Sequence, residues 1–272
     1  MNIIIIIFIL GLCIGSFINA FVFRLHEKRN ARYKKINLSI LNGRSICPNC
    51  KHPLSVYDLV PVFSWLLLGG KCRYCRHKIS IQYPLIEVLT AVLFVISYIQ
   101  WPYSFSLYGW LEFGIWLLLV SIFVILAVYD YKWLLLPNKI VFYLTIIGLS
   151  ELFLLNYGNG IHFVGILLAI GAGFLISFFF YLLFILSKGQ WIGGGDVKIA
   201  FVLGILAGNP INALSLIFIA SLLGTIFTIP SLINRKRKIN SHIPFGPFLI
   251  FATFIVFIFT SNITSIYHNL YF

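Results

Sequence analysis

Two aspartates of this chain are embedded in strongly hydrophobic sequence. Asp196 closes a run of three glycines in residues 191–198, WIGGGDVK, and Asp130 ends the apolar segment 106–129. Glycine carries no side chain that could shield the carboxylate, and it permits both positive φ and close approach of another segment. An unpartnered carboxylate in such surroundings costs roughly a few kcal/mol, so we expect Asp130 and Asp196 to be partners.

Two neighbouring carboxyl groups carry a specific kind of chemistry. They cannot both ionise cheaply, so the pair shares one proton. The ionised member can act as a general base on water while the protonated member polarises a peptide carbonyl, which leads to hydrolysis of a peptide bond. The alternative is that both aspartates are interfacial charges at helix ends. The glycine run and the expected common depth favour the catalytic interpretation.

Four cysteines form a second candidate site. Cys47 and Cys50 make one C-x2-C knuckle, Cys72 and Cys75 make another, and 21 residues separate the two. This spacing approaches that of a four-cysteine zinc ribbon, and we expect a structural site because four thiolates leave no open position for water. A reducing cytosol argues against disulfides, which leaves four unligated thiols as the alternative. We expect Cys13, in the first apolar run, to be a small buried hydrophobe.

The composition indicates that membrane helices must position these groups. Of 272 residues, 60% are hydrophobic and 10% charged, against about 25% charged residues in soluble domains. A crossing needs about 20 apolar residues. We predict spans at residues 3–23, 84–101, 106–129, 139–157, 162–186, 211–233 and 245–262. An eighth segment, 197–208, is short and contains Gly204 and Gly208, so it is expected to be a tilted half-span or a re-entrant element.

The basic residues predict the orientation of these spans. The first run lacks a basic region before it and an Ala-x-Ala site after it, so we interpret it as a retained helix rather than a signal peptide. An external N-terminus places 24–83, 130–138, 187–196 and 234–244 in the cytoplasm, with all 20 Lys and Arg there or at its boundary. Both aspartates then lie at the cytoplasmic face. The net charge of +13 reflects orientation and contact with the lipid bilayer, and no nucleic-acid partner is expected.

Four other polar residues carry weaker signals. Glu87, at the start of the second span, could line a polar pocket or pair with an arginine of the loop. Glu112 and Glu151 fall in the outward halves of their spans, where we expect water to reach them. Asn19 stands close to Gly15, which is typical of a helix contact between small residues that an interhelical hydrogen bond holds.

These residues together resemble the type IV prepilin leader peptidase family of type IV pilus, type II secretion and competence systems. The resemblance extends from residue 15 to residue 248, and the order of the motifs makes it specific. Its motifs are Gly15–Asn19 followed by Phe23–Leu25, Ser45–Cys50, the stretch from Asp58 to Glu87, the Gly-x-Gly-Asp motif that ends at Asp196, and Pro244–Phe248. The Gly-x-Gly-Asp motif is shared with presenilin-like intramembrane proteases.

The resemblance implies a membrane aspartyl endopeptidase with Asp130 and Asp196 as catalytic residues. It implies removal of a short basic leader from prepilin or pseudopilin substrates, after a glycine and at the cytoplasmic side of the cell membrane. It also implies methylation of the new N-terminal amine with S-adenosylmethionine, and zinc at Cys47, Cys50, Cys72 and Cys75. No residue of the sequence identifies the methyl-donor site, so methylation rests on the resemblance alone.

The chain departs from the family pattern at three points. His26 replaces a proline often found after the first motif, and Asn138 follows Pro137 where an acidic residue is common. The cysteine loop is rich in lysine and would repel a basic leader, so charge complementarity cannot be the principle of recognition.

We therefore expect an all-α polytopic membrane protein with about eight transmembrane helices and a cytoplasmic zinc-ribbon-like insertion after the first helix. Its parts are the first helix at 1–23, the zinc-binding loop domain at 24–83 and a membrane domain at 84–272. One alternative is a proton-coupled transporter that uses the aspartate pair, although transporters usually bind near the bilayer midplane in related halves. Another is a non-enzymatic assembly platform whose zinc loop docks partners.

Overall fold

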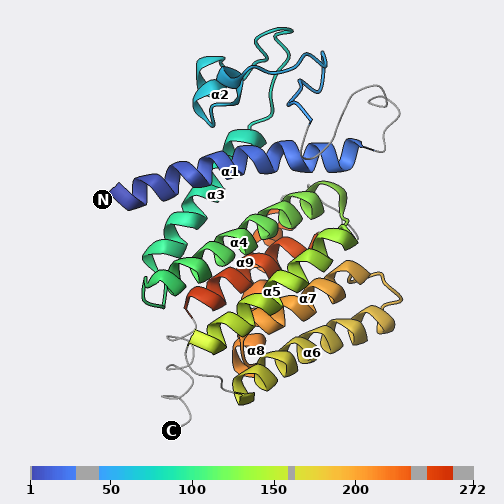
Figure 1. Ribbon diagram of the computed structural model, residues 1–272. Coiled ribbons are helices and arrows are strands. Elements are labelled where there is room, and N and C mark those ends of the chain that lie inside the picture. Colours follow the sequence, from blue (N-terminus) through green and yellow to red (C-terminus); the bar gives the residue numbers. More distant parts are fainter. Residues whose placement is uncertain (1, 29–42, 159–162, 234–243, 260–272) are drawn as a thin grey trace. The chain divides into compact units, whose positions relative to one another are not determined.

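The computed structural model describes residues 2–28, 43–158, 163–233 and 244–259 (Figure 1). Within these ranges the chain is helical, and the only β-type pairings described are two isolated bridges in the cysteine loop, Ile46 with Pro53 and Lys71 with Lys78. The basic residues 235–238 and loop residues 29–42 lie outside the described ranges. The packing divides the chain into two compact units, residues 1–99 and 100–272.

The first unit consists of two long helices and the cysteine loop between them. Its elements are α1 (Asn2–Glu27), the 3-10 helix η2 (Val56–Leu59), α2 (Phe63–Leu67) and α3 (Gln82–Ile99). Helices α1 and α3 approach so closely that a Cβ added at Gly15 would lie 2.6 Å from the Cα of Glu87. Asn19 Nδ2 donates a 3.0 Å hydrogen bond to the carbonyl of Tyr83. The expected contact between small residues, with its interhelical hydrogen bond, is confirmed.

The described residues of the second unit form a helical bundle (Figure 1), and both aspartates belong to this unit. Its elements are α4 (Leu107–Trp133), α5 (Asn138–Gly158), α6 (Phe163–Leu186), α7 (Gly194–Ala207), α8 (Pro210–Ile233) and α9 (Gly246–Ile258). Helix α7 is short but buried along most of its length, from Ile199 to Ala207 apart from one residue. It packs against α5, α6, α8 and α9.

Glycine residues allow α7 to pack closely against its neighbouring helices. A Cβ at Gly204 would lie 2.7 Å from the Cα of Gly173 in α6, so only two glycines allow this approach. Gly208 ends α7 in the left-handed region, with φ at 80°, where glycine is favoured. Gly204 and Gly208 made the sequence pattern of 197–208 ambiguous. In the structure Gly204 allows this helix to pack, and Gly208 ends it.

Each of the eight apolar segments predicted from the sequence contains a helix in the part that the structure describes. Among the described residues, five helices are long and apolar enough to cross a membrane, by length and composition: α1, α3, α4, α6 and α8, the last over Pro210–Ile229. The described part of α9 has 13 residues and α7 has 14. The all-helical membrane class is confirmed, while the number of crossings stays a prediction.

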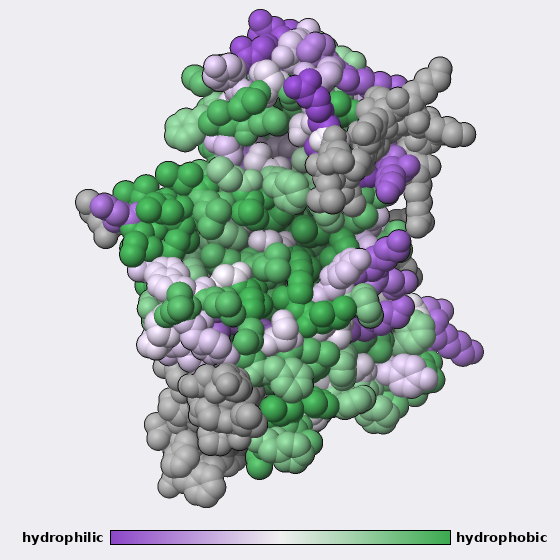
Figure 2. Space-filling model, in the orientation of Figure 1, coloured by the Kyte–Doolittle hydropathy of each residue, from purple (hydrophilic) through white to green (hydrophobic). Residues whose placement is uncertain are grey.

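The outward surfaces of the helices are apolar. In α6, for example, Phe174, Phe178 and Leu186 are 61–74% exposed. Figure 2 shows hydrophobic side chains over the visible flanks of the helices and hydrophilic ones gathered on the cysteine loop. Large exposed apolar side chains on a helix that is otherwise packed indicate contact with lipid rather than water.

Two expectations about polar residues are wrong. Glu112 and Glu151 are buried, at 4% and 0% exposure, rather than open to water. The loop residue Trp101 packs on Phe113 of α4, and neighbouring Tyr103 is enclosed as well. Burial, and then the charges of the two glutamates, raise the pKa of Tyr103 to about 12. Linear position along a helix could not reveal that the packed bundle buries both glutamates.

Cys13 is also placed differently from its expectation. It is exposed on α1 rather than buried. The first apolar run turns only one side toward α3, so many of its apolar side chains remain on the outside.

Candidate active site and metal centre

Asp130 lies in the last turn of α4. Its side chain is buried, with 6% exposure, and Oδ2 makes no hydrogen bond within the described part of the chain. The helix ends at Leu134 in the left-handed region, and the Leu134 N–H donates a 2.8 Å hydrogen bond to the Asp130 carbonyl. This termination fixes the backbone beside the carboxyl group and turns the chain toward α5.

Asp196 lies in the first turn of α7, where the helix has unpaired N–H groups. Its Oδ2 accepts a 3.3 Å hydrogen bond from the Gly193 N–H, and its own N–H donates to the Gly193 carbonyl at 3.0 Å. A carboxylate at this position also interacts favourably with the helix dipole. The local fold therefore orients Asp196 through backbone groups alone.

The glycine run acts by close approach rather than by unusual dihedral angles. Glycine permits positive φ, but none of the three glycines adopts it. A Cβ added at Gly195 would lie 3.1 Å from the Cβ of Leu136, in the turn between α4 and α5. On the same side, Lys198 Nζ donates a 3.0 Å hydrogen bond to Asn138 Oδ1. The neutral amide of Asn138 thus accepts from Lys198 at a position where an acidic residue is common.

The start of α9 brings the two carboxyl groups into one space. A Cβ added at Gly246 would lie 2.6 Å from Asp130 Oδ2 and 3.5 Å from Asp196 Oδ1. The two oxygens are therefore no more than roughly 6 Å apart, the sum of these distances. One water that donates to or accepts from both groups, at about 2.8 Å each, fits this separation. Such a pair can hold and activate a water molecule.

Gly246 is the site residue whose role the sequence did not reveal. The motif Pro244–Phe248 drew attention to this turn, but nothing in the motif indicated what the glycine contacts. In the structure the missing side chain leaves the space in front of both carboxyl groups. The available signal was a glycine immediately before a proline at a helix start, where α9 indeed begins.

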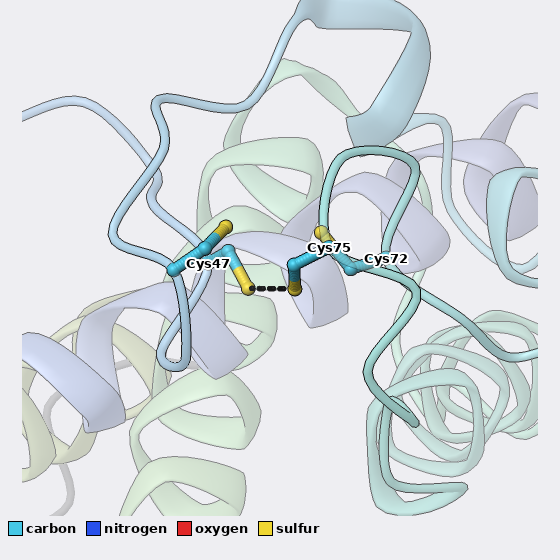
Figure 3. A group of neighbouring side chains, drawn as sticks. Cys47, Cys72 and Cys75 are labelled. Carbon is cyan, nitrogen blue, oxygen red and sulfur yellow. Dashed lines mark hydrogen bonds between the residues drawn. The ribbon is translucent and has the colours of Figure 1, made fainter.

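The four cysteines come together in the first unit. Their sulfur atoms all lie within 4.8 Å of one another, and Cys47 Sγ is 3.9 Å from Cys75 Sγ. Figure 3 shows these two side chains directed toward each other from the two knuckles, with Cys72 beside Cys75. Zn–S bonds of about 2.3 Å in a tetrahedron place sulfurs roughly 3.8 Å apart. The cluster therefore fits a zinc ion.

The two knuckles have the same backbone pattern. The Cys47 N–H donates to the His52 carbonyl at 3.0 Å, and the Cys72 N–H donates to the His77 carbonyl at 2.9 Å. In each knuckle the residue after the second cysteine, Lys51 or Arg76, has positive φ. Two independent segments thus adopt one turn geometry that directs paired thiols to a common point.

The electrostatics of the thiols suit a cation. The backbone N–H of His77, then the side chain of Asn49, lower the pKa of Cys75 to about 6, so this thiol ionises readily. Burial raises the pKa of Cys47 to about 12, since a buried thiolate needs a compensating charge. A divalent metal ion supplies that charge.

An ion pair stabilises the loop around this cluster. Arg73 Nε lies 2.7 Å from Asp58 Oδ1, and Tyr74 donates its hydroxyl to Asp58 Oδ2 at 3.2 Å. Burial acts to raise the pKa of Asp58, but the hydrogen bonds from Arg73 and Ser55 outweigh it and hold the pKa below its usual value. The second knuckle is thereby tied to the segment that precedes α2.

Comparison with known proteins agrees with this arrangement. Residues 9–101 match the bacterial Peptidase A24 N-terminal domain, and residues 117–229 match the type IV leader peptidase family. The prepilin leader peptidase/N-methyltransferase of Bacillus subtilis (strain 168) is 30% identical over 96% of both chains. The proteins of that name from Pectobacterium carotovorum subsp. carotovorum and Neisseria gonorrhoeae are each 32% identical, over 89% and 92% of this chain and 88% of their own. No solved structure matches.

These matches place this helical membrane protein, with its carboxyl pair and its four-thiol cluster, in a known class of enzyme. The chain belongs to the type IV leader peptidase family. Both aspartates lie within residues 117–229, which match that family, whereas Gly246 lies beyond them.

Gly246→Ala tests the close contact at the start of α9. The added Cβ would meet Asp130 Oδ2 at 2.6 Å, so the carboxyl group must move. A displacement of about 1 Å can cost roughly 100-fold in rate, and we expect peptidase activity to fall by about that factor. Gly171→Ala is the matched control, because its added Cβ meets nothing within 4 Å in α6. Equal activity of the two variants would show that the contact is unimportant.

Zinc content tests the cysteine cluster. We expect about one zinc ion per purified chain, and less in Cys72→Ser, whose loop should also become sensitive to protease, since metal binding and folding are linked. Elemental analysis and limited proteolysis measure the two effects. Cys13→Ser, which changes a cysteine outside the cluster, is the control. A metal-free protein with a protease-resistant loop would contradict the assignment.

Proposed function

We propose that this protein is a membrane aspartyl endopeptidase that removes the basic leader from type IV prepilin-like proteins. The observation that carries the proposal is the pair of buried carboxyl groups, Asp130 and Asp196, which face one small space at the start of α9. The names of the relatives supply the substrate class.

The chemistry follows from the surroundings of the pair. One carboxylate takes a proton from water while the other carboxylic acid donates a hydrogen bond to the scissile carbonyl. The water attacks the carbonyl carbon, and the leaving amine then takes up a proton as the C–N bond breaks. The Gly193 N–H holds Asp196, and Asp130 is buried beside the start of α9, so little reorganisation accompanies the reaction.

The proposed site of cleavage is the cytoplasmic face of the cell membrane. Lys132, Lys139, Lys188 and Lys198 all flank the helix ends that carry or adjoin the aspartates. Loops with such a basic bias remain in the cytoplasm. A prepilin with its leader on that side and its hydrophobic helix in the bilayer would present the peptide bond at this depth.

The second proposed activity is methylation of the newly exposed N-terminal amine with S-adenosylmethionine. The relatives are named as both leader peptidases and N-methyltransferases. Hydrolysis and methyl transfer have different requirements, because the carboxyl pair must admit water and a methyl transfer must exclude it. We therefore propose that the two activities use different groups of this chain, with zinc at the four cysteines in a structural role.

Substitution of either aspartate tests the peptidase. Asp130→Asn and Asp196→Asn should each lower prepilin cleavage by roughly 10²–10⁴-fold or more, while the protein still inserts normally. The double variant should be no worse than either single one, because members of one catalytic unit are not additive. Mass spectrometry of the product measures cleavage. Glu151→Gln removes another buried carboxylate of the same unit and should leave the rate near that of the wild type.

Substantial cleavage by either single aspartate variant would refute the catalytic assignment. It would leave the proton-coupled transporter and the assembly platform as the alternatives.

A pilin supplied without its leader tests whether the two activities are separate. Asp196→Ala should fail to cut prepilin but should still methylate the shortened pilin, which gains ~14 Da per methyl group. Changes in the cysteine loop should impair methylation at least as much as cleavage. If a folded Asp196→Ala protein cannot methylate the shortened pilin, one centre performs both reactions. If the wild type never adds the methyl group, the chain is a peptidase only.

A further inference from the structure

The short helix α2 leaves most of its apolar side chains uncovered. Phe63, Leu66 and Leu67 are 60–86% exposed. They stand at positions i, i+3 and i+4, so they share one side of the helix, which we call the apolar side of α2. The preceding η2 adds Val56 and Tyr57, which are 79% and 80% exposed. Large apolar side chains gathered on the surface of a short segment indicate a contact with a partner.

The packing of α1 against α3 gives the level at which α2 begins. A Cβ added at Gly11 would lie 2.5 Å from the Cα of Ala91. One added at Gly15 would lie 2.6 Å from the Cα of Glu87, so the two helices are antiparallel and these two residues are level. Arg24, the first basic residue of α1, follows Gly15 by nine residues, which is about 13 Å along the helix. Glu87 consequently lies well inside the apolar part of this helix pair.

Glu87 ties the start of α2 to this level. It lines a cavity between the helix pair and the loop, which is one of the two roles expected for it from the sequence. Its Oε2 accepts a 2.7 Å hydrogen bond from the Val62 N–H. Val62 caps α2 with φ at 61°, a conformation that a β-branched residue keeps only where surrounding contacts hold it. Helix α2 therefore begins beside the apolar part of α1 and α3, rather than beyond the basic end of α1.

A second connection holds the other side of α2 in place. The indole N–H of Trp65 donates a 3.2 Å hydrogen bond to the Ile79 carbonyl, and the Ile79 N–H donates to the Gly70 carbonyl at 2.7 Å. Ser64 and Trp65 line the same cavity, whose wall follows α1 as far as Cys13. One side of α2 thus faces the cavity and the helix pair, and the apolar side points away from them.

Exposed basic residues follow this apolar segment in the sequence. They are Lys71, Arg73, Arg76 and Lys78. Asp58, the only acidic residue between α1 and α3, is paired with Arg73. Apolar side chains beside exposed basic ones are typical of a segment that lies at the surface of an anionic membrane. A basic leader would be repelled here, so the charge favours lipid over the substrate as the partner.

We propose that the apolar side of α2 is a membrane-docking surface, on which Phe63, Leu66 and Leu67 insert among the acyl chains of the bilayer. The bilayer is the solvent at this level, because α2 begins beside the apolar parts of α1 and α3. The basic residues that follow α2 contact anionic headgroups. The loop is then a partly inserted element rather than a domain that stands free in the cytoplasm. This inference goes beyond the two proposed reactions and does not rest on them.

Labelling from the lipid side tests this surface on the wild-type protein. The full-length protein is placed in vesicles of phosphatidylcholine and phosphatidylglycerol that carry a photoreactive diazirine on an acyl chain, and mass spectrometry identifies the labelled peptides. We expect adducts on residues 60–68 as well as on exposed apolar residues of α1 and α3, which report that the protein is inserted. Adducts on α1 and α3 with none on residues 60–68 would overturn the proposal, because water or protein would then cover α2.

A pair of substitutions tests whether the contact depends on apolar character. Leu67 is the most exposed residue of α2, so its side chain makes few contacts that folding requires. Leu67→Asp should lower the labelling of residues 60–68, relative to that of α3, by at least about tenfold, since hydrocarbon excludes a carboxylate. Leu67→Phe is the matched control and should keep the wild-type ratio. Equal labelling of these two variants would contradict insertion of this side of α2.

Discussion

The arrangement of the second unit depends on holding two carboxyl groups inside a helical bundle whose outer surface is apolar. Such groups are tolerated only where backbone or side-chain partners replace water. Asp196 obtains its partner from Gly193 at the start of α7, and Asp130 faces the start of α9. Both arrangements require helix ends, rather than helix middles, to meet. Gly204 and Gly173 let α7, which begins beside Asp196, lie close to α6.

Much of this architecture could be predicted, because the deciding signals are local in the sequence. Apolar segments of membrane length became helices within a few residues of their expected bounds, since lipid leaves the backbone few other ways to satisfy its hydrogen bonds. The two cysteine knuckles were recognisable because each is one short turn with fixed ligand spacing. The contact of Asn19 with α3 was also foreseeable from its small neighbours.

The features that escaped prediction depend on contacts between distant segments. Glu112 and Glu151 were expected to be hydrated, but both are buried, and burial depends on how the helices pack, which the position of a residue in its own span does not describe. The glycines before Asp196 permitted either positive φ or a close approach, and the structure shows the second, because Gly195 lets Leu136 lie near. Gly246 contacts a carboxyl group that lies far from it in sequence. A glycine pattern shows that space is required, but only the fold shows what occupies that space.

The metal cluster is connected to the stability of the cysteine loop. A polar insertion of this length buries too little apolar surface to fold on its own, so a membrane enzyme needs another source of free energy there. Four thiolates around zinc would supply it, and the same loop then contributes Trp65 and the backbone N–H that holds Glu87. On this view the metal takes no part in the chemistry. It keeps the loop folded, and in the proposed function the hydrolysis belongs to the carboxyl pair of the other unit.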